Sequence, residues 1–477
     1  MRFISTRGQT TEPKTFEESL FCCYTEDGGV LMPETIPKVD LMTLQKWKNL
    51  NYIALVKEIV SFYVSSDEVT LQDQSDLIDA AFSSFDIDEV IQLAKLENGL
   101  NILELWHGKT LAFKDLAMSC TAQFINYFLS KRGRHFTAVV VTSGDTGSSA
   151  IHNALDLPCI DIIVIFPHKR ISKFQERMMT TVLAKNIHVY AADGSNDDIE
   201  NTVINVMNDG ELVKKHPLLG TLNSQNWCRI LVQESIAHSV YAYLHATERV
   251  GAPVDIIIPC GGYGNMASCL IAKEMGVPIN PVSVSNANDF MYRVVKTNEL
   301  VLSKVQATIA PAMDIGFPLN SERVFWLLSG GNGQLIRELM EKFIETGHAN
   351  LPADLHTKLV KTVETSVASE SAIIEAIQRC WKESNYPICP HTATAVAHYY
   401  GLTEGYKESE NPAVHLATAS AAKFSEALTK AGIPLQRSPK IDVLEKKKSQ
   451  YTMLAKGDNW KKILREKIVE ISCRANR

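Results

Sequence analysis

Residues 254–273 read VDIIIPCGGYGNMASCLIAK, and this stretch decides the fold. Its first seven residues predict a buried strand, the glycines at 261, 262 and 264 predict a tight turn, and the apolar residues from Met266 onward predict a helix. The N–H groups of such a turn and of the helix N-terminus suit an anion such as phosphate, although an ordinary strand-to-helix turn would also use glycines. The spacing is not that of a dinucleotide-binding loop, and no Walker lysine follows.

The same pattern of an apolar run, a turn and a helical segment recurs elsewhere in the chain. Short β-branched runs at 138–141, 160–166 and 188–191 end in polar or glycine-rich turns and lead into helical segments. Strands that alternate with helices predict parallel sheets covered on both faces. Ligands of such folds bind where the carboxyl ends of strands meet helix N-termini. We therefore expect an α/β core with its site at these loops.

Helical periodicity dominates three further regions. Apolar stripes start at Leu44 and Ile53, at Leu335, and at Trp460. Ordinary packing into a core accounts for all of these stripes. We expect a mainly helical N-terminal domain at 1–96, an α/β core at 97–430 with a helical insertion near 330–382, and a helical tail at 431–477.

The bulk composition favours a cytoplasmic protein that acts on small molecules. The 477 residues include 48 Lys and Arg against 54 Asp and Glu, a net charge of −6, without the block of like charge that a nucleic-acid or membrane partner would require. Neither a signal peptide nor an apolar stretch of about 20 residues is evident. The ten scattered cysteines indicate reduced thiols, and we expect no metal site.

Two other loops carry candidate chemistry. Residues 139–148 read VVVTSGDTGS and offer hydroxyls and helix-start N–H groups to a carboxylate or phosphate, although Ser and Thr are also routine helix caps. The nucleophile-elbow pattern G-x-S-x-G is absent from them. Residues 107–115 read HGKTLAFKD, where Lys114 follows an apolar Leu-Ala-Phe. A lysine in apolar surroundings can act as a nucleophilic amine, although most lysines are merely solvated.

Taken in this order, the three loops resemble the threonine synthase family of fold-type II pyridoxal-phosphate enzymes. The resemblance covers almost the whole chain and is carried by further segments: STRG at 5–8, DGG at 27–29, NSQNW at 223–227, AMDI at 312–315, NSER at 320–323, PHT at 390–392 and AAKF at 421–424. It implies a fold with two parallel-sheet lobes and a helical N-terminal domain. The AMDI and NSER segments disfavour a serine or threonine dehydratase.

The resemblance also implies roles for individual residues. Lys114 would hold pyridoxal 5'-phosphate as a Schiff base, Asp145 would lie near the ring hydroxyl of this cofactor, and Thr418 would lie at its pyridine nitrogen. The cofactor phosphate would bind to Gly261, Gly262, Tyr263, Gly264 and Asn265. The substrate would contact Ser143, Gly144, Thr146, Asn226, Arg229 and Lys109, and cations for its phosphate would come from Lys109, Lys173, Arg177 and Arg229.

Four positions depart from the biosynthetic family pattern. Lys109 stands where Pro is usual, Gln225 where Ile is usual, Cys389 where Asp is usual, and Ser420 where the His of a His-Pro pair is usual. These departures disfavour threonine synthesis. The Ser-Ala-Ala-Lys-Phe form at 420–424 resembles the animal threonine synthase-like 2 branch, whose members act as phospho-lyases on phosphorylated amino acids.

The expected function is therefore a phospho-lyase that converts O-phosphohomoserine to 2-oxobutyrate, ammonia and phosphate, with O-phosphothreonine as a second candidate substrate. The alternatives are threonine synthase proper, which adds water at Cβ, and a non-catalytic descendant that acts as a binding or signalling protein. The expected partner is a small phosphorylated amino acid. We expect a monomer or a homodimer.

Overall fold

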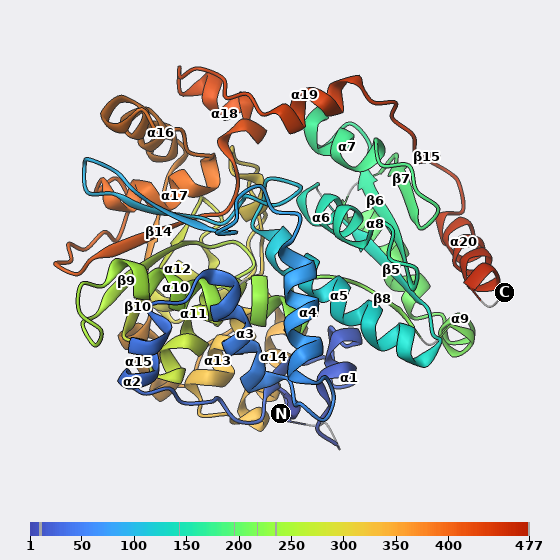
Figure 1. The fold of residues 1–477 in the computed structure, drawn as a ribbon, viewed down its shortest axis with the longest axis horizontal. Coiled ribbons are helices and arrows are strands. Elements are labelled where there is room, and N and C mark those ends of the chain that lie inside the picture. Colours follow the sequence, from blue (N-terminus) through green and yellow to red (C-terminus); the bar gives the residue numbers. More distant parts are fainter. Residues whose placement is uncertain (9–11, 143, 195, 217, 234–235, 476–477) are drawn as a thin grey trace.

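Two sheets in separate lobes form the frame of the chain (Figure 1), and the computed structural model describes residues 1–8, 12–142, 144–194, 196–216, 218–233 and 236–475. The larger sheet has the strand order β13-β10-β9-β14-β4-β3, and only its β3–β4 pair is antiparallel. Its strands are β3 (Gln92–Lys95), β4 (Asn101–Glu104), β9 (Val254–Pro259), β10 (Ile279–Ser285), β13 (Glu364–Val367) and β14 (Ala413–Ala417).

The smaller sheet is wholly parallel, with the order β15-β7-β6-β5-β8. Its strands are β5 (Phe136–Val141), β6 (Ile160–Pro167), β7 (Ile187–Ala192), β8 (Leu219–Gly220) and β15 (Thr452–Leu454). All residues of the central strand β6 are buried, as expected for a strand covered on both faces. The apolar runs predicted from the sequence at 138–141, 160–166, 188–191 and 254–259 thus lie in β5, β6, β7 and β9.

Helices cover both sheets (Figure 1). Those of the larger lobe are α10 (Ile236–Ala246), α11 (Gly264–Met275), α12 (Phe290–Thr297), α13 (Ser321–Leu328), α14 (Gly333–Thr346), α15 (Ala353–Thr362), α16 (Glu370–Ser384), α17 (Pro390–Tyr399) and α18 (Ser425–Lys430). Those of the smaller lobe are α6 (Asp145–Ala154), α7 (Lys173–Thr180), α8 (Asn196–Met207), α9 (Gly210–Lys215), α19 (Pro439–Lys446) and α20 (Trp460–Ala475). The long helix α5 (Lys114–Arg132) packs against α6 and against the π-helix η1 (Arg229–Gln233).

The N-terminal segment packs on α5 and α10. It contains the antiparallel pair β1 (Phe3–Ser5) and β2 (Leu31–Pro33), and the helices α1 (Phe16–Phe21), α2 (Leu41–Trp47), α3 (Tyr52–Tyr63) and α4 (Leu71–Phe82). Leu44, Trp47, Val56 and Ile59 of the predicted stripes are buried. The aromatic rings of Phe16 and Phe124 meet edge to face, with centroids 5.3 Å apart, so this segment shares the core of the lobes.

The regions predicted to be helical also contribute strands. The segment 330–382 contains α14, α15 and most of α16, but its β13 forms one edge of the larger sheet. The tail contains α19 and α20, but its β15 pairs with β7 at one edge of the smaller sheet. Both strands are short, and their pairing depends on partners far away in the sequence, so local periodicity could not reveal them.

The last helix is attached to the smaller sheet through a buried carboxylate. Asp161 of β6 accepts hydrogen bonds from His135 and His188, each at 2.7 Å, and forms an ion pair with Arg474 of α20. Burial opposes ionisation of Asp161, but these three partners outweigh it and hold the pKa of the carboxyl well below its usual range. The end of the chain is thereby fixed to the sheet.

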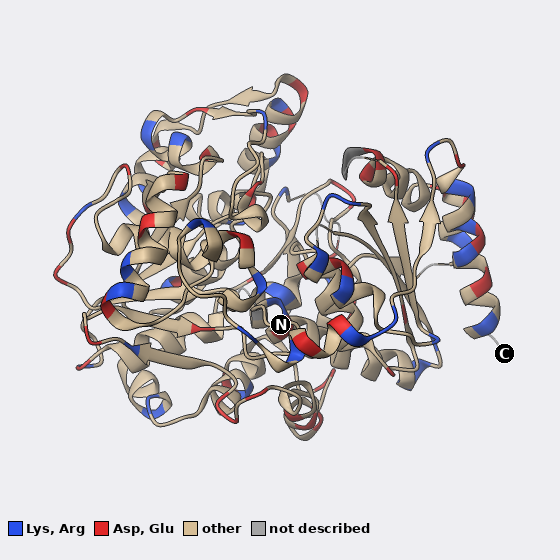
Figure 2. Cartoon of the chain, turned by 90° about the horizontal axis from the view of Figure 1, so that it is seen from above, with Lys and Arg blue, Asp and Glu red and all other residues tan. Residues whose placement is uncertain are grey.

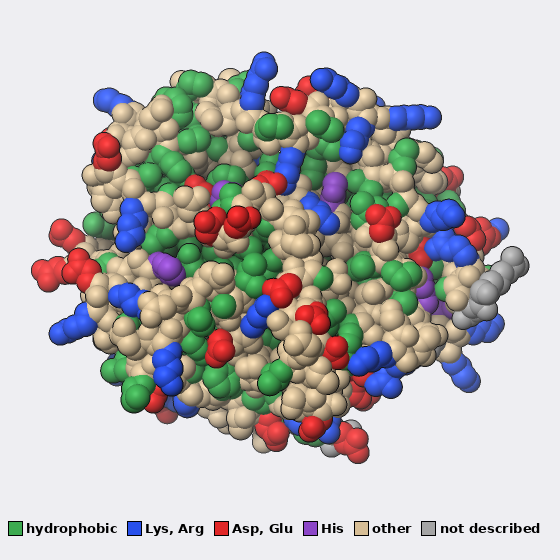
Figure 3. All heavy atoms as spheres, viewed as in Figure 1, with side chains coloured by type: hydrophobic (Ala, Val, Ile, Leu, Met, Phe, Trp, Pro, Cys, Tyr) green, Lys and Arg blue, Asp and Glu red, His purple; other side chains and the backbone are tan. Residues whose placement is uncertain are grey.

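Charged residues of both signs are mixed over the molecule. Figure 2 shows Lys and Arg interspersed with Asp and Glu along the helices of both lobes, and Figure 3 shows the same mixture on one face. Opposite charges therefore balance one another locally over these views. No helix among the described residues combines the length and the apolar character needed to cross a bilayer.

Candidate active site

A cavity of about 390 Å³ is lined by residues of both lobes. The smaller lobe and the start of α5 contribute Lys114, Thr142, Asp145 and Thr146, and the larger lobe contributes the glycine loop that follows β9 and Thr418 after β14. The carboxyl ends of β5, β9 and β14 thus meet at this cavity, as expected for ligand sites in parallel sheets.

Lys114 is the first residue of α5, and the preceding loop is fixed by the buried carboxylate of Asp115. Asp115 accepts hydrogen bonds from the backbone N–H of Thr110 at 2.6 Å and from the hydroxyl of Ser149 on α6 at 2.7 Å. A Cβ at Gly108 would lie only 2.4 Å from the Cβ of Asp115, so the loop needs glycine to approach this closely. These contacts hold the Lys114 side chain at the cavity.

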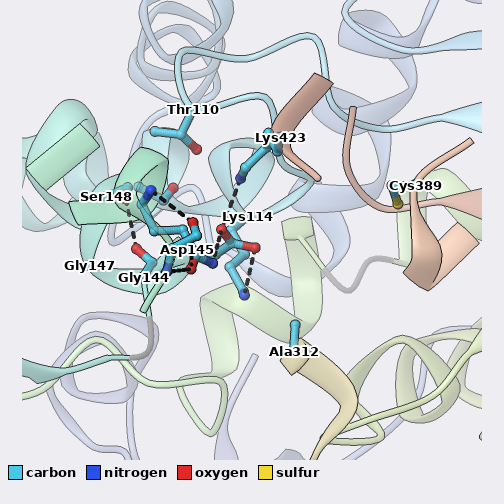
Figure 4. A network of polar contacts seen from close by, with 12 residues as sticks. Thr110, Lys114, Gly144, Asp145, Gly147, Ser148, Ala312, Cys389 and Lys423 are labelled. Atoms are coloured by element: carbon cyan, nitrogen blue, oxygen red, sulfur yellow. Dashed lines mark hydrogen bonds and ion pairs between the residues drawn. The ribbon is translucent and has the colours of Figure 1, made fainter. Parts of the chain in front are cut away.

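Asp145 begins α6 and lies between two amines (Figure 4). Its Oδ1 accepts a hydrogen bond from Lys423 Nζ at 2.9 Å, and its Oδ2 lies 3.8 Å from Lys114 Nζ. Burial opposes ionisation, but the ion pair with Lys423 outweighs it and holds the pKa of Asp145 well below its usual range. Asp145 therefore carries a negative charge at neutral pH.

The loop around Asp145 requires an unusual backbone. Gly144 has φ +134°, a conformation that L side chains rarely adopt, and a Cβ there would lie within 2.7 Å of three Gln175 side-chain atoms. The hydroxyl of Thr142 accepts hydrogen bonds from the N–H groups of Gly144 at 2.9 Å and Gly147 at 3.1 Å. The Thr142 side chain thus fixes Gly144 and Gly147 at the start of α6.

The glycine loop between β9 and α11 opens onto the cavity. A Cβ at Gly262 would have no neighbour closer than 3.8 Å, whereas a Cβ at Gly261 would lie 3.0 Å from Ala312 O and 3.0 Å from Met313 Cα. Tyr263 has φ +67°, which is strained for a non-glycine residue and is typical of functional sites. Asn265 Oδ1, buried at the start of α11, has no hydrogen-bond partner among the described residues.

The NSER segment supports this loop from behind. Asn320 donates a hydrogen bond to Gly262 O at 3.1 Å, and Arg323 donates one to Gln225 O at 2.6 Å. Between them, Glu322 forms a buried ion pair with Arg7 at 2.9 Å, which connects the N-terminal segment to the site. A removed partner would leave a buried charge unpaired, so these residues are tightly coupled.

The AMDI segment lines the cavity and starts in the 3₁₀-helix η2 (Pro311–Met313). Asp314 accepts hydrogen bonds from Asn286 at 2.8 Å and from the backbone N–H of Thr308 at 2.8 Å. The N–H of Ala312 donates to His391 Nε2 at 3.0 Å, so this ring nitrogen is an acceptor. Burial lowers the pKa of His391 to about 4, which keeps the ring neutral at pH 7.

Comparison with known proteins identifies the family. The family model described as Pyridoxal-phosphate dependent enzyme matches residues 90–341, Threonine synthase N terminus matches 2–82, and Threonine synthase, C-terminal matches 392–465. The chain belongs to the threonine synthase family. It is 44% identical to Threonine synthase-like 2 of Homo sapiens over 477 residues, which cover 99% of this chain and 98% of the relative.

Members named threonine synthase are similar as well. The enzyme of Pseudomonas aeruginosa is 33% identical over 437 residues, which cover 91% of each chain. The crystal structure of PLP-bound threonine synthase from Brucella melitensis matches with a TM-score of 0.92 and 28% identity over 98% of this chain and 99% of that chain. The predicted fold class is confirmed: the chain has the fold of fold-type II pyridoxal-phosphate enzymes, and its cofactor is pyridoxal 5'-phosphate.

The cavity of this family member fits the cofactor. The open space beside Gly262 and the backbone N–H groups at the N-terminus of α11 provide a binding place for a phosphate group. Lys114 supplies an amine at the same cavity. The described His, Cys, Asp and Glu residues contain no group of three or more that could hold a metal ion.

Most of the site residues predicted from the threonine synthase family pattern line the cavity: Lys114, Asp145, Thr146, Arg229, Gly261, Gly262, Tyr263, Gly264, Asn265 and Thr418. Gly144 directly precedes Asp145 but does not line the cavity, and Ser143 lies outside the described residues.

Four other predicted contacts do not reach the cavity. Lys109 donates to His152 O at 3.1 Å, and Asn226 bonds Leu20 O at 2.7 Å and the N–H of Cys228 at 3.0 Å. Lys173 is exposed, and Arg177 donates to Leu444 O at 2.9 Å. These groups satisfy buried backbone atoms or face solvent, which are the common roles of such side chains.

Two residues at the cavity or in contact with its lining carried no predicted role. Lys423, at the end of the 3₁₀-helix η3 (Ala421–Lys423), forms the ion pair with Asp145, and His391 lines the cavity. Both lie in segments that resemble the family. The signal for Lys423 was a lysine among small residues just after a buried strand, where a charge must find a buried partner.

Proposed function

We propose that this chain is a phospho-lyase that releases phosphate from O-phosphohomoserine, with O-phosphothreonine as a second substrate, and that gives 2-oxobutyrate and ammonia. Its place in a pyridoxal-phosphate-dependent family supports elimination chemistry. The higher identity to Threonine synthase-like 2, 44%, than to the Pseudomonas aeruginosa threonine synthase, 33%, supports the lyase branch. The alternative of threonine synthase is compatible with the same family.

When bound, pyridoxal phosphate supplies an aldehyde that condenses with amines and a ring that withdraws electrons from the carbon next to the amino group. In this proposal, Lys114 holds the cofactor, accepts the proton from the substrate Cα and moves a proton at Cβ. Thr146 offers its hydroxyl group to the substrate carboxylate. Thr418 places a neutral hydroxyl at the ring nitrogen.

Arg229 is the proposed partner of the substrate phosphate. Among the described residues that line the cavity, Lys114 and Arg229 are the only Lys or Arg side chains. Arg229 is buried and donates one N–H to Leu222 O at 3.1 Å, which fixes the guanidinium in place. A planar guanidinium suits a phosphate better than a lysine does, because it offers several donors in a fixed geometry.

The observation that carries the lyase assignment is Gln225. This residue lines the cavity and is buried, its Nε2 donates to Ser224 Oγ at 3.3 Å, and its Oε1 has no partner among the described residues. Since a buried amide oxygen needs a hydrogen-bond donor, we expect the Gln225 amide to turn toward the cavity that this residue lines and to bind water there. The isoleucine usual at this position in the family would recruit none.

The position of water separates the two reactions. Each consumes one water per substrate: a synthase adds it at Cβ and forms threonine, whereas a lyase uses it to replace the amino group and forms 2-oxobutyrate and ammonia. A water molecule bound to the amide of Gln225 would lie at a different position from one beside the isoleucine that is usual in the family. A misplacement of about 1 Å can cost on the order of 100-fold in rate, so the lyase outcome dominates.

The test is product analysis with the full-length holoenzyme and O-phosphohomoserine. Phosphate, 2-oxobutyrate and threonine are measured together, and 2-oxobutyrate should exceed threonine. Threonine as the dominant product would restore the synthase assignment. If neither O-phosphohomoserine nor O-phosphothreonine released phosphate, the non-catalytic alternative would be favoured.

Matched variants test the role of Gln225. Gln225→Ile restores the usual family residue and should raise the share of threonine in the product, whereas Gln225→Asn keeps an amide and should leave 2-oxobutyrate dominant. An identical product ratio in the wild type and Gln225→Ile would show that Gln225 does not determine the outcome. The wild-type product would still decide between lyase and synthase.

A further inference from the structure

A second buried amine lies next to the cofactor lysine. The side chain of Lys423 is 2% exposed, and its Nζ donates to Asp145 Oδ1 at 2.9 Å. Lys423 does not line the cavity, so it is separated from substrate and cofactor by Asp145 itself. Removing an ammonium group from water costs several kcal/mol, and a hydrophobic side chain at position 423 would avoid that cost. The buried charge of Lys423 therefore calls for a functional explanation.

The two oxygens of Asp145 have different partners (Figure 4). Oδ1 accepts hydrogen bonds from Lys423 and, at 3.3 Å, from Gln175, whereas Oδ2 lies 3.8 Å from Lys114 Nζ, beyond hydrogen-bond distance. His391 on α17 also faces this group, and it is neutral at pH 7 because burial lowers its pKa to about 4. The carboxylate of Asp145 thus lies near two amines but accepts a hydrogen bond from only one of them, Lys423.

This arrangement bears on the reactivity of Lys114. An amine attacks a carbonyl only through its lone pair, so it must first lose its extra proton. A neighbouring carboxylate without another partner would stabilise the ammonium form of Lys114. Because Lys423 already neutralises Asp145, a proton on Lys114 would leave one positive charge in excess within the buried group of Lys114, Asp145 and Lys423.

We propose that Lys423 is a positioning residue that binds Asp145 and thereby leaves the amine of Lys114 uncharged and able to react with the cofactor aldehyde. In that reaction the Lys114 nitrogen forms a double bond to the aldehyde carbon, and the carbonyl oxygen leaves as water with both amine protons. Lys423 touches neither reactant. The inference concerns cofactor capture and is independent of the choice between lyase and synthase.

The test measures cofactor capture as a function of pH. Full-length protein freed of its cofactor is mixed with pyridoxal phosphate, and the rate at which the visible absorbance of the lysine-bound form appears is recorded from pH 6 to pH 10. In Lys423→Met the pH midpoint of the capture rate should move upward by about one to two units, which corresponds to about 10-fold to 100-fold slower capture at pH 7.

Two further variants separate this role from a structural one. Lys423→Arg keeps the positive charge and should retain a midpoint near that of the wild type. In the double variant Lys423→Met with Asp145→Asn, the carboxylate is removed as well, so the midpoint should return toward the wild-type value. Circular dichroism shows whether each variant is folded, and Lys423→Gln replaces Lys423→Met if the latter fails to fold.

The proposal is overturned by an unchanged midpoint in a folded variant that lacks the charge at 423. It is equally overturned if the double variant keeps the upward shift, because the shift would then not arise from Asp145. Loss of cofactor capture in Lys423→Arg with a wild-type midpoint in Lys423→Gln would point to shape, not charge, as the role of this side chain.

Discussion

A pair of neighbouring glycines offers a sharp test of the site geometry. In Gly261→Ala the new methyl group would lie 3.0 Å from Ala312 O and 3.0 Å from Met313 Cα, both of which are backbone atoms. These atoms cannot move away easily, because Asp314 and His391 hold their segment by hydrogen bonds. Such overpacking costs about 1–3 kcal/mol. The free energy of unfolding of the cofactor-free protein should fall by this amount.

Gly262→Ala is the matched control. Its methyl group would have no neighbour closer than 3.8 Å and would project into the cavity. Stability should therefore change by less than about 0.5 kcal/mol, while a methyl group in the phosphate-binding place should weaken cofactor affinity by about 10-fold to 100-fold. Denaturant unfolding of the cofactor-free protein and titration with pyridoxal phosphate measure the two quantities. Equal stability of both variants, or unaltered cofactor affinity in Gly262→Ala, would refute this geometry.

Further predictions concern the lysine, a histidine and the carboxylate of β6. Lys114→Ala should lose the cofactor that borohydride fixes covalently in the wild type, and peptide mapping that finds fixed cofactor on Lys423 instead would contradict the assignment. The pKa of His391 is about 4 in the folded protein against an ordinary 6.5, so the unfolded chain binds more protons between these pH values. The free energy of unfolding should therefore fall by about 3 kcal/mol as the pH falls from 6.5 to 4. His391→Gln should remove this part of the pH dependence of unfolding. Asp161→Ala should lower the free energy of unfolding, measured by denaturant unfolding, by about 3–5 kcal/mol. The loss of stability on replacing Arg474 alone should be smaller, and it measures the contribution of the ion pair with α20.

The sequence predicted the strands and loops whose signals are local. The β-branched run at 254–259 forms a strand because it is buried on both faces, and Gly261 suits the turn because a Cβ there would lie 3.0 Å from backbone atoms. Lys114 was singled out by its apolar approach and the helix start, but its role came from the resemblance to the threonine synthase family. These local signals indicated several of the segments that line the cavity.

Other features depend on contacts between distant residues. Lys423 and Asp145 are 278 residues apart in the chain, so neither residue reveals the other from its neighbours. Asn226 looked like a ligand group in its motif, but its amide satisfies Leu20 O and the N–H of Cys228. Cys389, a departure from the family pattern, keeps a structural role, since its Sγ accepts the N–H of Thr392 at 3.4 Å at the start of α17.

The position of β14 constrains the order in which the chain can mature during synthesis. β14 is inserted between β4 and β9 and brings Thr418 to the cavity, yet it is made more than 100 residues after β9. A nascent chain folds from its N-terminus as it emerges, so the edges of β4 and β9 that face each other across β14 must wait unpaired until β14 arrives. Parallel strands that wait are open to wrong pairing and aggregation. Ribosomal stalling before residue 413 would therefore yield a product that cannot retain the cofactor.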